Sequence, residues 1–302
     1  MPYTSQSNFP STSIVKLIYG EKHVFALAGT RSLMMQVLHG LFYEGMKGSR
    51  LLDNPQERLE RTALIMETIY WGSKQEAIEV TRFVRQLHMK VRGVVKNHPG
   101  SIPDGTEYNA NNPHAQRWVM ATMMESAVSM YDLLVRPLTR AQCDQYVREM
   151  QVVARLFGAQ DEHLFHTYAE VELFVAQMYA TFGRTDIPPV MRLELTEAAR
   201  KLHLGQLLKP DNFVGKLFQQ QWEVLIKGAL PPEVRDAFKI SLSASEAVCF
   251  WKQAQSLKCA IAETRRWGPL AMLSPLTWCN LPALAWIDFA SHGPIFYGRR
   301  KK

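Results

Sequence analysis

The chain has 302 residues, of which 47% are hydrophobic and 21% charged, and its formal net charge is +7. This balance is typical of a globular protein with a sizeable core and excludes a disordered or collagen-like chain. The basic residues are spread along many segments and are not interleaved with aromatic residues as in a nucleic-acid platform, so we expect no nucleic acid partner.

The helical period of apolar residues recurs along nearly the whole chain, whereas alternating strand patterns are scarce. An Asp-Gly pair at 104–105 falls in a polar loop where we expect no flanking strands. The sequence therefore predicts an all-α fold, built as a single large helical domain over residues 14–292. The expected helices are 30–46, 55–71, 74–96, 112–136, 139–157, 161–181, 189–203, 211–228, 232–240 and 243–266.

The two ends of the chain differ from this domain in composition. Residues 1–13 are rich in Ser, Thr, Gln and Pro and predict a disordered leader, and residues 293–302 form a basic tail. The apolar stretch 268–290 is interrupted by three prolines, so we expect broken helices there and no membrane span. Peripheral contact of this stretch with a membrane surface stays open.

The cysteines indicate the compartment. They form no C-x-x-C pair, so we expect no zinc site, and the chain shows no signal peptide. Reduced thiols in the cytoplasm are the better interpretation of such a large chain. The four cysteines are Cys143, Cys249, Cys259 and Cys279.

The helix expected at 55–71 carries charged residues on a face that is otherwise apolar. Arg58, Arg61 and Thr62 are spaced i, i+3, i+4 and share one side of the helix. Buried arginines need partners, which here would be a carboxylate, a phosphate or the acidic edge of a cofactor. An alternative is that both arginines pair with acids on their own or a neighbouring helix.

The helix expected at 74–96 has a histidine within its apolar stripe. His88 lies between Val84 and Val91, among apolar residues. If the two helices fold back at Gly72, His88 stands opposite Arg58 at a similar height, across an apolar gap. A histidine in such a stripe is also often a hydrogen-bonded core residue, and the spacing alone does not decide between these interpretations.

Five segments, read in order, resemble a known family. They are residues 31–39 (RSLMMQVLH), 54–62 (NPQERLERT), 84–93 (VRQLHMKVRG), 108–113 (YNANNP) and 118–122 (WVMAT). Together they resemble the rubber-oxygenase catalytic domain family, which includes latex-clearing proteins and the mycophenolic-acid pathway oxygenase. The resemblance covers residues 25–160 and becomes faint beyond them.

The resemblance implies a fold, a cofactor and a reaction. It implies a globin-like core that holds haem b, with His88 as the proximal iron ligand. Arg58, Arg61 and Thr62 then occupy the distal segment of the family, which cleaves carbon–carbon double bonds of isoprenoids with dioxygen. Rubber-cleaving members have a lysine at the position of Arg61, and they use a carboxylate base to which Glu44 is a candidate match.

Several other residues are candidates for a functional site. His39 is the second candidate for binding haem, or a distal-pocket residue, and otherwise a histidine near a helix end. His163 and His166 are spaced i, i+3, but a solvated face explains them better than a metal site. Tyr108 and Trp118 are either pocket-lining or core aromatic residues.

From these patterns we expect a cytoplasmic, haem b-dependent oxygenase. It would act with dioxygen on a hydrophobic, unsaturated, isoprenoid- or lipid-like small molecule. The catalytic residues would be Arg58, Arg61 and Thr62, and the haem would be bound by His88, Arg58 and His39. The alternative is a catalytically inactive helical module of the same ancestry, which carries haem or binds a protein.

Overall fold

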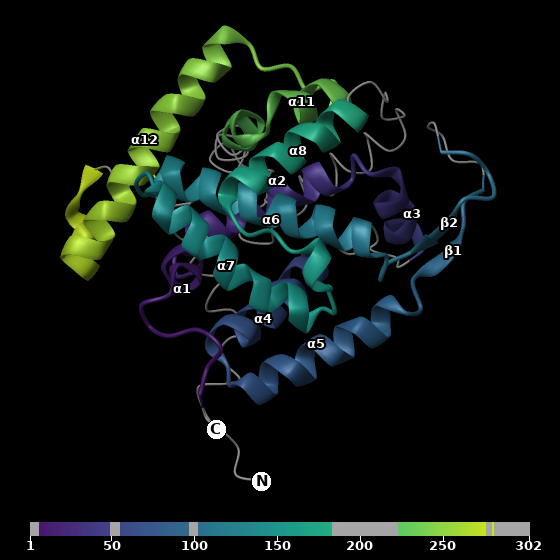
Figure 1. Ribbon diagram of the computed structural model, residues 1–302. Coiled ribbons are helices and arrows are strands. Elements are labelled where there is room, and N and C mark those ends of the chain that lie inside the picture. Colours follow the sequence, from purple (N-terminus) through teal and green to yellow (C-terminus); the bar gives the residue numbers. More distant parts are fainter. Residues whose placement is uncertain (1–5, 49–54, 97–101, 183–222, 276–279, 281–302) are drawn as a thin grey trace.

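The computed structural model describes residues 6–48, 55–96, 102–182, 223–275 and 280 (Figure 1). The described part is predominantly α-helical, which confirms the predicted all-α class. The globin-like character of the core stays a prediction. The helix expected at 189–203, most of that at 211–228 and the basic tail lie outside the described residues.

The helices and strands follow one another along the chain with mostly short connections. They are α1 Ile14–Tyr19, α2 Lys22–Gln36, α3 Gly40–Gly48, α4 Pro55–Trp71, α5 Lys74–His88, β1 Arg92–Val94, β2 Glu107–Asn109, α6 Pro113–Leu134, α7 Arg140–Leu156, η1 Asp161–His163, α8 Tyr168–Phe182, α11 Pro232–Phe238, α12 Ala244–Trp267 and η2 Gly268–Leu273. Residues 223–229 form a further helical segment. Within the described ranges, no helix combines the length and apolar content that crossing a bilayer requires.

The segment before α1 differs from the expected disordered leader. Phe9 is only 1% exposed and packs edge-on against Tyr70 of α4, with ring centroids 5.9 Å apart. Ser7 forms an isolated bridge with Ser73, and the hydroxyl of Ser13 caps α1 by accepting from Lys16 N at 3.1 Å. A buried aromatic ring stabilises this polar segment, so residues 6–13 are part of the packed domain.

Helices α4 and α5 form the predicted helical hairpin, with the reversal at Gly72 (Figure 1). Ser73 begins α5 with a capping box: its hydroxyl accepts from Glu76 N at 3.2 Å, and the Glu76 carboxylate accepts from Ser73 N at 2.8 Å. Such reciprocal bonds satisfy backbone donors that a helix start leaves free. They fix the direction in which α5 leaves the turn.

Helix α5 is shorter than predicted, because it ends at His88 instead of continuing to residue 96. The chain then pairs β1 with β2 in a short antiparallel hairpin, in which Gly93 stands opposite Tyr108. Gly105 lies in the connection with φ of +90°, which favours glycine. The expectation that the Asp-Gly pair lacks flanking strands is therefore wrong, since both strands are only three residues long and their alternation is hard to detect.

Helix α6 lies at the centre and packs along α2 (Figure 1). Arg31 of α2 is buried and forms an ion pair with Glu125 of α6, where its Nη2 donates to Oε1 at 2.7 Å. Its Nη1 donates to Ser126 Oγ at 2.9 Å, and its Nε donates to the carbonyl of Ala229 at 2.8 Å. One guanidinium thus joins α2, α6 and the end of the 223–229 segment.

We expect Arg31→Met to reduce the free energy of unfolding by about 3–5 kcal/mol, because it leaves the Glu125 carboxylate buried without its cation. Urea denaturation followed by circular dichroism measures the change. The matched control is Arg140→Met, which breaks the exposed Arg140–Glu172 pair and should cost far less, because solvent screens exposed ion pairs. Equal losses in the two variants would contradict this account of the buried pair.

Candidate functional site

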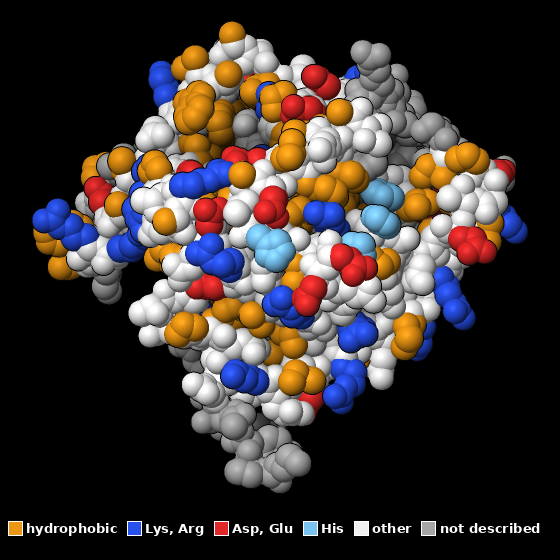
Figure 2. Space-filling model, in the orientation of Figure 1, with side chains coloured by type: hydrophobic (Ala, Val, Ile, Leu, Met, Phe, Trp, Pro, Cys, Tyr) orange, Lys and Arg blue, Asp and Glu red, His pale blue; other side chains and the backbone are white. Residues whose placement is uncertain are grey.

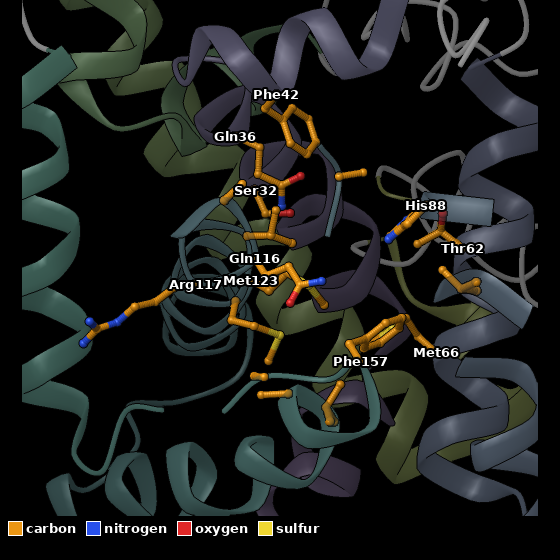
Figure 3. Close-up of a pocket in the computed structure, with 18 of the residues that line it drawn as sticks. Ser32, Gln36, Phe42, Thr62, Met66, His88, Gln116, Arg117, Met123 and Phe157 are labelled. Carbon is orange, nitrogen blue, oxygen red and sulfur yellow. The ribbon is translucent and has the colours of Figure 1, made fainter. Parts of the chain in front are cut away.

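A cavity of about 1350 Å³ lies between α2, α3, α4, α5, α6 and the end of α7 (Figure 3). Pockets for single small molecules usually measure about 300–1,000 Å³. This cavity therefore has room for a large cofactor together with a substrate.

The wall formed by α5 presents one continuous helical face to the cavity. Val80, Val84 and His88 repeat at intervals of four residues, and Leu87 lies beside them. His88 is half-buried, and Figure 3 shows its ring directed into the cavity. Its Nδ1 atom is fully buried, so Nε2 is the ring atom available to a group in the cavity.

The wall formed by α4 contributes two of the three predicted distal residues. Arg61 and Thr62 line the same cavity as His88, and both are exposed to its open space. Ile65 and Met66 continue this face one turn further. The structure thus brings Arg61, Thr62 and His88 to one cavity, whereas the side chain of Arg58 lies outside the described residues.

The opposite wall carries polar residues that the sequence patterns did not single out. Gln116 at the start of α6 projects into the cavity, and Ser32 and Gln36 of α2 lie near it (Figure 3). Gln36 Nε2 donates to Thr122 Oγ1 at 3.1 Å, which fixes its amide. The helical spacing of Gln116 with Met120 and Met123 could have identified this face of α6.

Methionines make up much of the apolar lining. Met side chains are unbranched and polarizable, so they adapt to irregular and varied ligands. Those that line the cavity are Met34, Met46, Met66, Met120, Met123 and Met124. Their number favours an extended hydrophobic ligand over a small polar one.

His39 lies between α2 and α3 and also lines the cavity. Burial of the ring lowers the pKa of His39 below its ordinary value of 6.5, because it disfavours the charged imidazolium. The side chain is therefore neutral at pH 7. A neutral imidazole can donate one hydrogen bond and accept another, or bind a metal.

The remaining candidates divide between cavity and core. Tyr108 lines the cavity, while Trp118 is fully buried in the core and packs edge-on against Tyr179. Glu44 is buried in α3, and it is not among the described residues that line the cavity. The candidate match to the family's base is therefore not supported by its position.

The histidine pair of the η1 region is separated. His163 lines the cavity, and its ring meets His114 edge-on with centroids 5.5 Å apart. His166 is exposed instead, and its Nδ1 lies 3.3 Å from Gln151 Nε2. Among the described residues, no three His, Cys, Asp or Glu side chains are grouped so that they could hold a metal ion.

Comparison with known proteins gives one match. A family model described as "ER-bound oxygenase mpaB/B'/Rubber oxygenase, catalytic domain" matches residues 18–258, which is well over half of the chain. No curated protein and no solved structure matches significantly. All the residues that line the cavity lie within the matched range, residues 18–258.

The lowered pKa of His39 predicts a pH-dependent stability. In the unfolded chain His39 takes up a proton near pH 6.5, whereas in the folded chain it does so only at lower pH. The free energy of unfolding therefore falls as the pH drops below about 6.5. We expect His39→Gln to flatten this decline in urea midpoints measured from about pH 7.5 to about pH 5.5. The exposed His166→Gln serves as the control and should leave the slope unchanged; an unchanged slope in His39→Gln would refute the prediction.

Proposed function

The chain belongs to this family of oxygenase catalytic domains, and we propose that it is a haem b-dependent oxygenase. Its substrate would be a hydrophobic, unsaturated, isoprenoid- or lipid-like molecule, and its oxidant dioxygen. The observation that carries the proposal is that His88, Arg61 and Thr62 line one large apolar cavity.

The residues present fit a haem. The cavity is larger than a single-substrate pocket and is lined mainly by apolar side chains, as a flat porphyrin requires. His88 lies on its wall with Nδ1 buried, which leaves Nε2 toward the interior. Arg61 also lines the cavity and would supply a cation for a propionate.

In this proposal His88 would bind the iron through Nε2. Arg58 is assigned to the haem edge on the strength of the family motif alone. Haem supplies the activation of dioxygen. The protein's own contribution is to bind the substrate, orient its double bond and exclude water.

The polar groups of the cavity can orient the reacting atoms. The hydroxyl of Thr62 can donate a hydrogen bond to a carbonyl oxygen that forms where the double bond is cleaved, and the amide of Gln116 can do so from the opposite wall. In a water-excluding apolar cavity such a bond is stronger than in water. Thr62 and Gln116 would therefore hold the reacting end while the methionines hold the chain.

Arg61 distinguishes this protein from rubber-cleaving relatives that have a lysine at this position. A guanidinium keeps its proton in proteins, so it has no lone pair with which to bind iron. We therefore propose that Arg61 acts as a fixed cation and not as a reversible ligand.

The thiols support a reducing compartment. Cys143, Cys249 and Cys259 are free in the structure, as expected for a protein of the cytoplasm. We propose the cytoplasm as the place of action on this ground.

The first test is the visible spectrum of the purified protein after haem titration. We expect a Soret band that corresponds to about one haem per chain. His88→Ala should lower the affinity for haem at least about tenfold, because it removes the proposed iron ligand. His163→Ala, on another part of the cavity wall, is the control and should bind haem normally. A protein that stays colourless, or equal binding by both variants, would overturn the haem assignment.

The second test separates an enzyme from a passive carrier. We expect the haem-loaded protein to consume dioxygen with an unsaturated isoprenoid, and Thr62→Val to lower the rate about 10- to 100-fold while leaving the Soret band unchanged. Oxygen-electrode traces together with carbonyl detection in the products measure this. Haem binding without oxygen uptake would favour the inactive haem-carrying module.

A further inference from the structure

The surface of α5 and β1 carries apolar side chains that are exposed in the described part of the chain. Phe83 is 57% exposed, Leu87 43%, Met89 56% and Val94 48%. Single exposed apolar residues are ordinary on a protein surface, but four within twelve residues of sequence are not. Burial of these side chains would require a partner.

The same segment is strongly basic. From position 82 to position 96 the sequence contains no Asp or Glu, while the cations are Arg82, Arg85, Lys90, Arg92 and Lys96. Along β1 and the two residues after it, the exposed side chains alternate as Arg92, Val94 and Lys96, which places them on one side of the chain. Figure 2 shows the basic and hydrophobic side chains interspersed over α5 and β1, at the lower right of the view.

Three acids adjoin this face. Glu107 of β2 pairs with Val94 across the hairpin and is exposed on the same side. Asp104 is exposed in the connection between the two strands, and Glu79 is exposed on α5 one turn before Phe83. Three carboxylates reduce the charge of the five cations at positions 82–96 without reversing it. The surface therefore keeps a net positive charge beside its apolar side chains.

The surface is continuous with the cavity. Phe83 and Leu87 lie four residues apart on one flank of α5, and both line the cavity as well as being exposed. Lys90 also lines the cavity and is exposed. An apolar molecule held at this surface would thus reach the interior along Phe83 and Leu87 without crossing a polar barrier.

We propose that the α5–β1 surface, defined as Arg82, Phe83, Leu87, Met89, Lys90, Arg92, Val94 and Lys96, docks on an anionic lipid bilayer. The cations contact lipid phosphate and carboxylate groups, and the apolar side chains enter the region between headgroups and acyl chains. The docking itself needs no haem. The delivery of a hydrophobic substrate from the bilayer to the cavity rests on the proposed function.

The mixture of residue types favours a bilayer over other partners. The centre of a protein–protein interface is depleted of charge, whereas here cations separate the apolar residues. A single-stranded nucleic acid would need several aromatic rings for stacking, and Phe83 is the one aromatic residue of this surface. The headgroup zone of an anionic bilayer accepts both kinds of side chain at once.

The test is co-sedimentation of the full-length protein, without added haem, with vesicles of phosphatidylcholine containing phosphatidylserine, and with pure phosphatidylcholine vesicles. We expect binding to the anionic vesicles that weakens with salt. Arg82→Gln with Lys96→Gln should lower the affinity about 25-fold, because each basic residue near such a surface contributes roughly a factor of five. Met89→Ser with Val94→Thr should weaken the binding that remains at high salt.

Arg148→Gln with Lys252→Gln removes the same charge from exposed positions of α7 and α12, and it should leave binding nearly unchanged. Equal loss in this control, or equal binding to both kinds of vesicle, would overturn the proposal. The proposal would also fail if the protein bound no vesicles but bound a single-stranded RNA oligonucleotide, and if the Arg82→Gln, Lys96→Gln variant lost that RNA binding. A haem titration of the same preparations, followed by the Soret band, separates membrane docking from haem binding. If the protein binds vesicles but takes up no haem, only the haem assignment is refuted.

Discussion

The guanidinium of Arg31 satisfies groups from three parts of the chain that are far apart in sequence. It holds Glu125 of α6, Ser126 beside it and the carbonyl of Ala229. Because a buried charge is costly without its partners, these groups must come together in one arrangement or the folded state loses much of its stability. The alignment of α2 against α6 follows from this requirement. Both helices line the cavity, so the same contact sets how far apart two of its walls stand.

The sequence patterns predicted the elements that rest on local rules. The limits of α4 coincide with the expected helix at 55–71, and α5 begins at the expected residue 74. The hairpin between them followed from the Gly72-Ser73 reversal, and it placed Arg61, Thr62 and His88 at one cavity. Periodicity alone left open what the cavity holds. The family motifs supplied haem as the expected occupant, which is why the role of His88 stays a proposal while its position does not.

The sequence patterns predicted the wrong structure where contacts between residues far apart in sequence outweigh local composition. The apolar period from Val80 to Val95 suggested one helix, yet Val95 is buried as part of the β1–β2 hairpin. A strand and a helix bury valine equally well, so the period could not distinguish them. Phe9 likewise lies in a polar segment whose composition suggested disorder, and its burial depends on Tyr70, which is more than sixty residues away. Gln116 gave no signal by type, because an amide on a helix face is usually solvated.

The β1–β2 hairpin depends on a single steric fit. At Gly93, a Cβ atom would stand 2.8 Å from the hydroxyl oxygen of Tyr108, so any larger residue at this position would have to displace that ring. A slip of β1 by one residue would exchange the two faces of that strand relative to β2. The cations of β1 would then turn toward the side on which Tyr108 lines the cavity. The absence of a side chain at Gly93 thus helps to decide which residues of β1 face the solvent and which face the cavity.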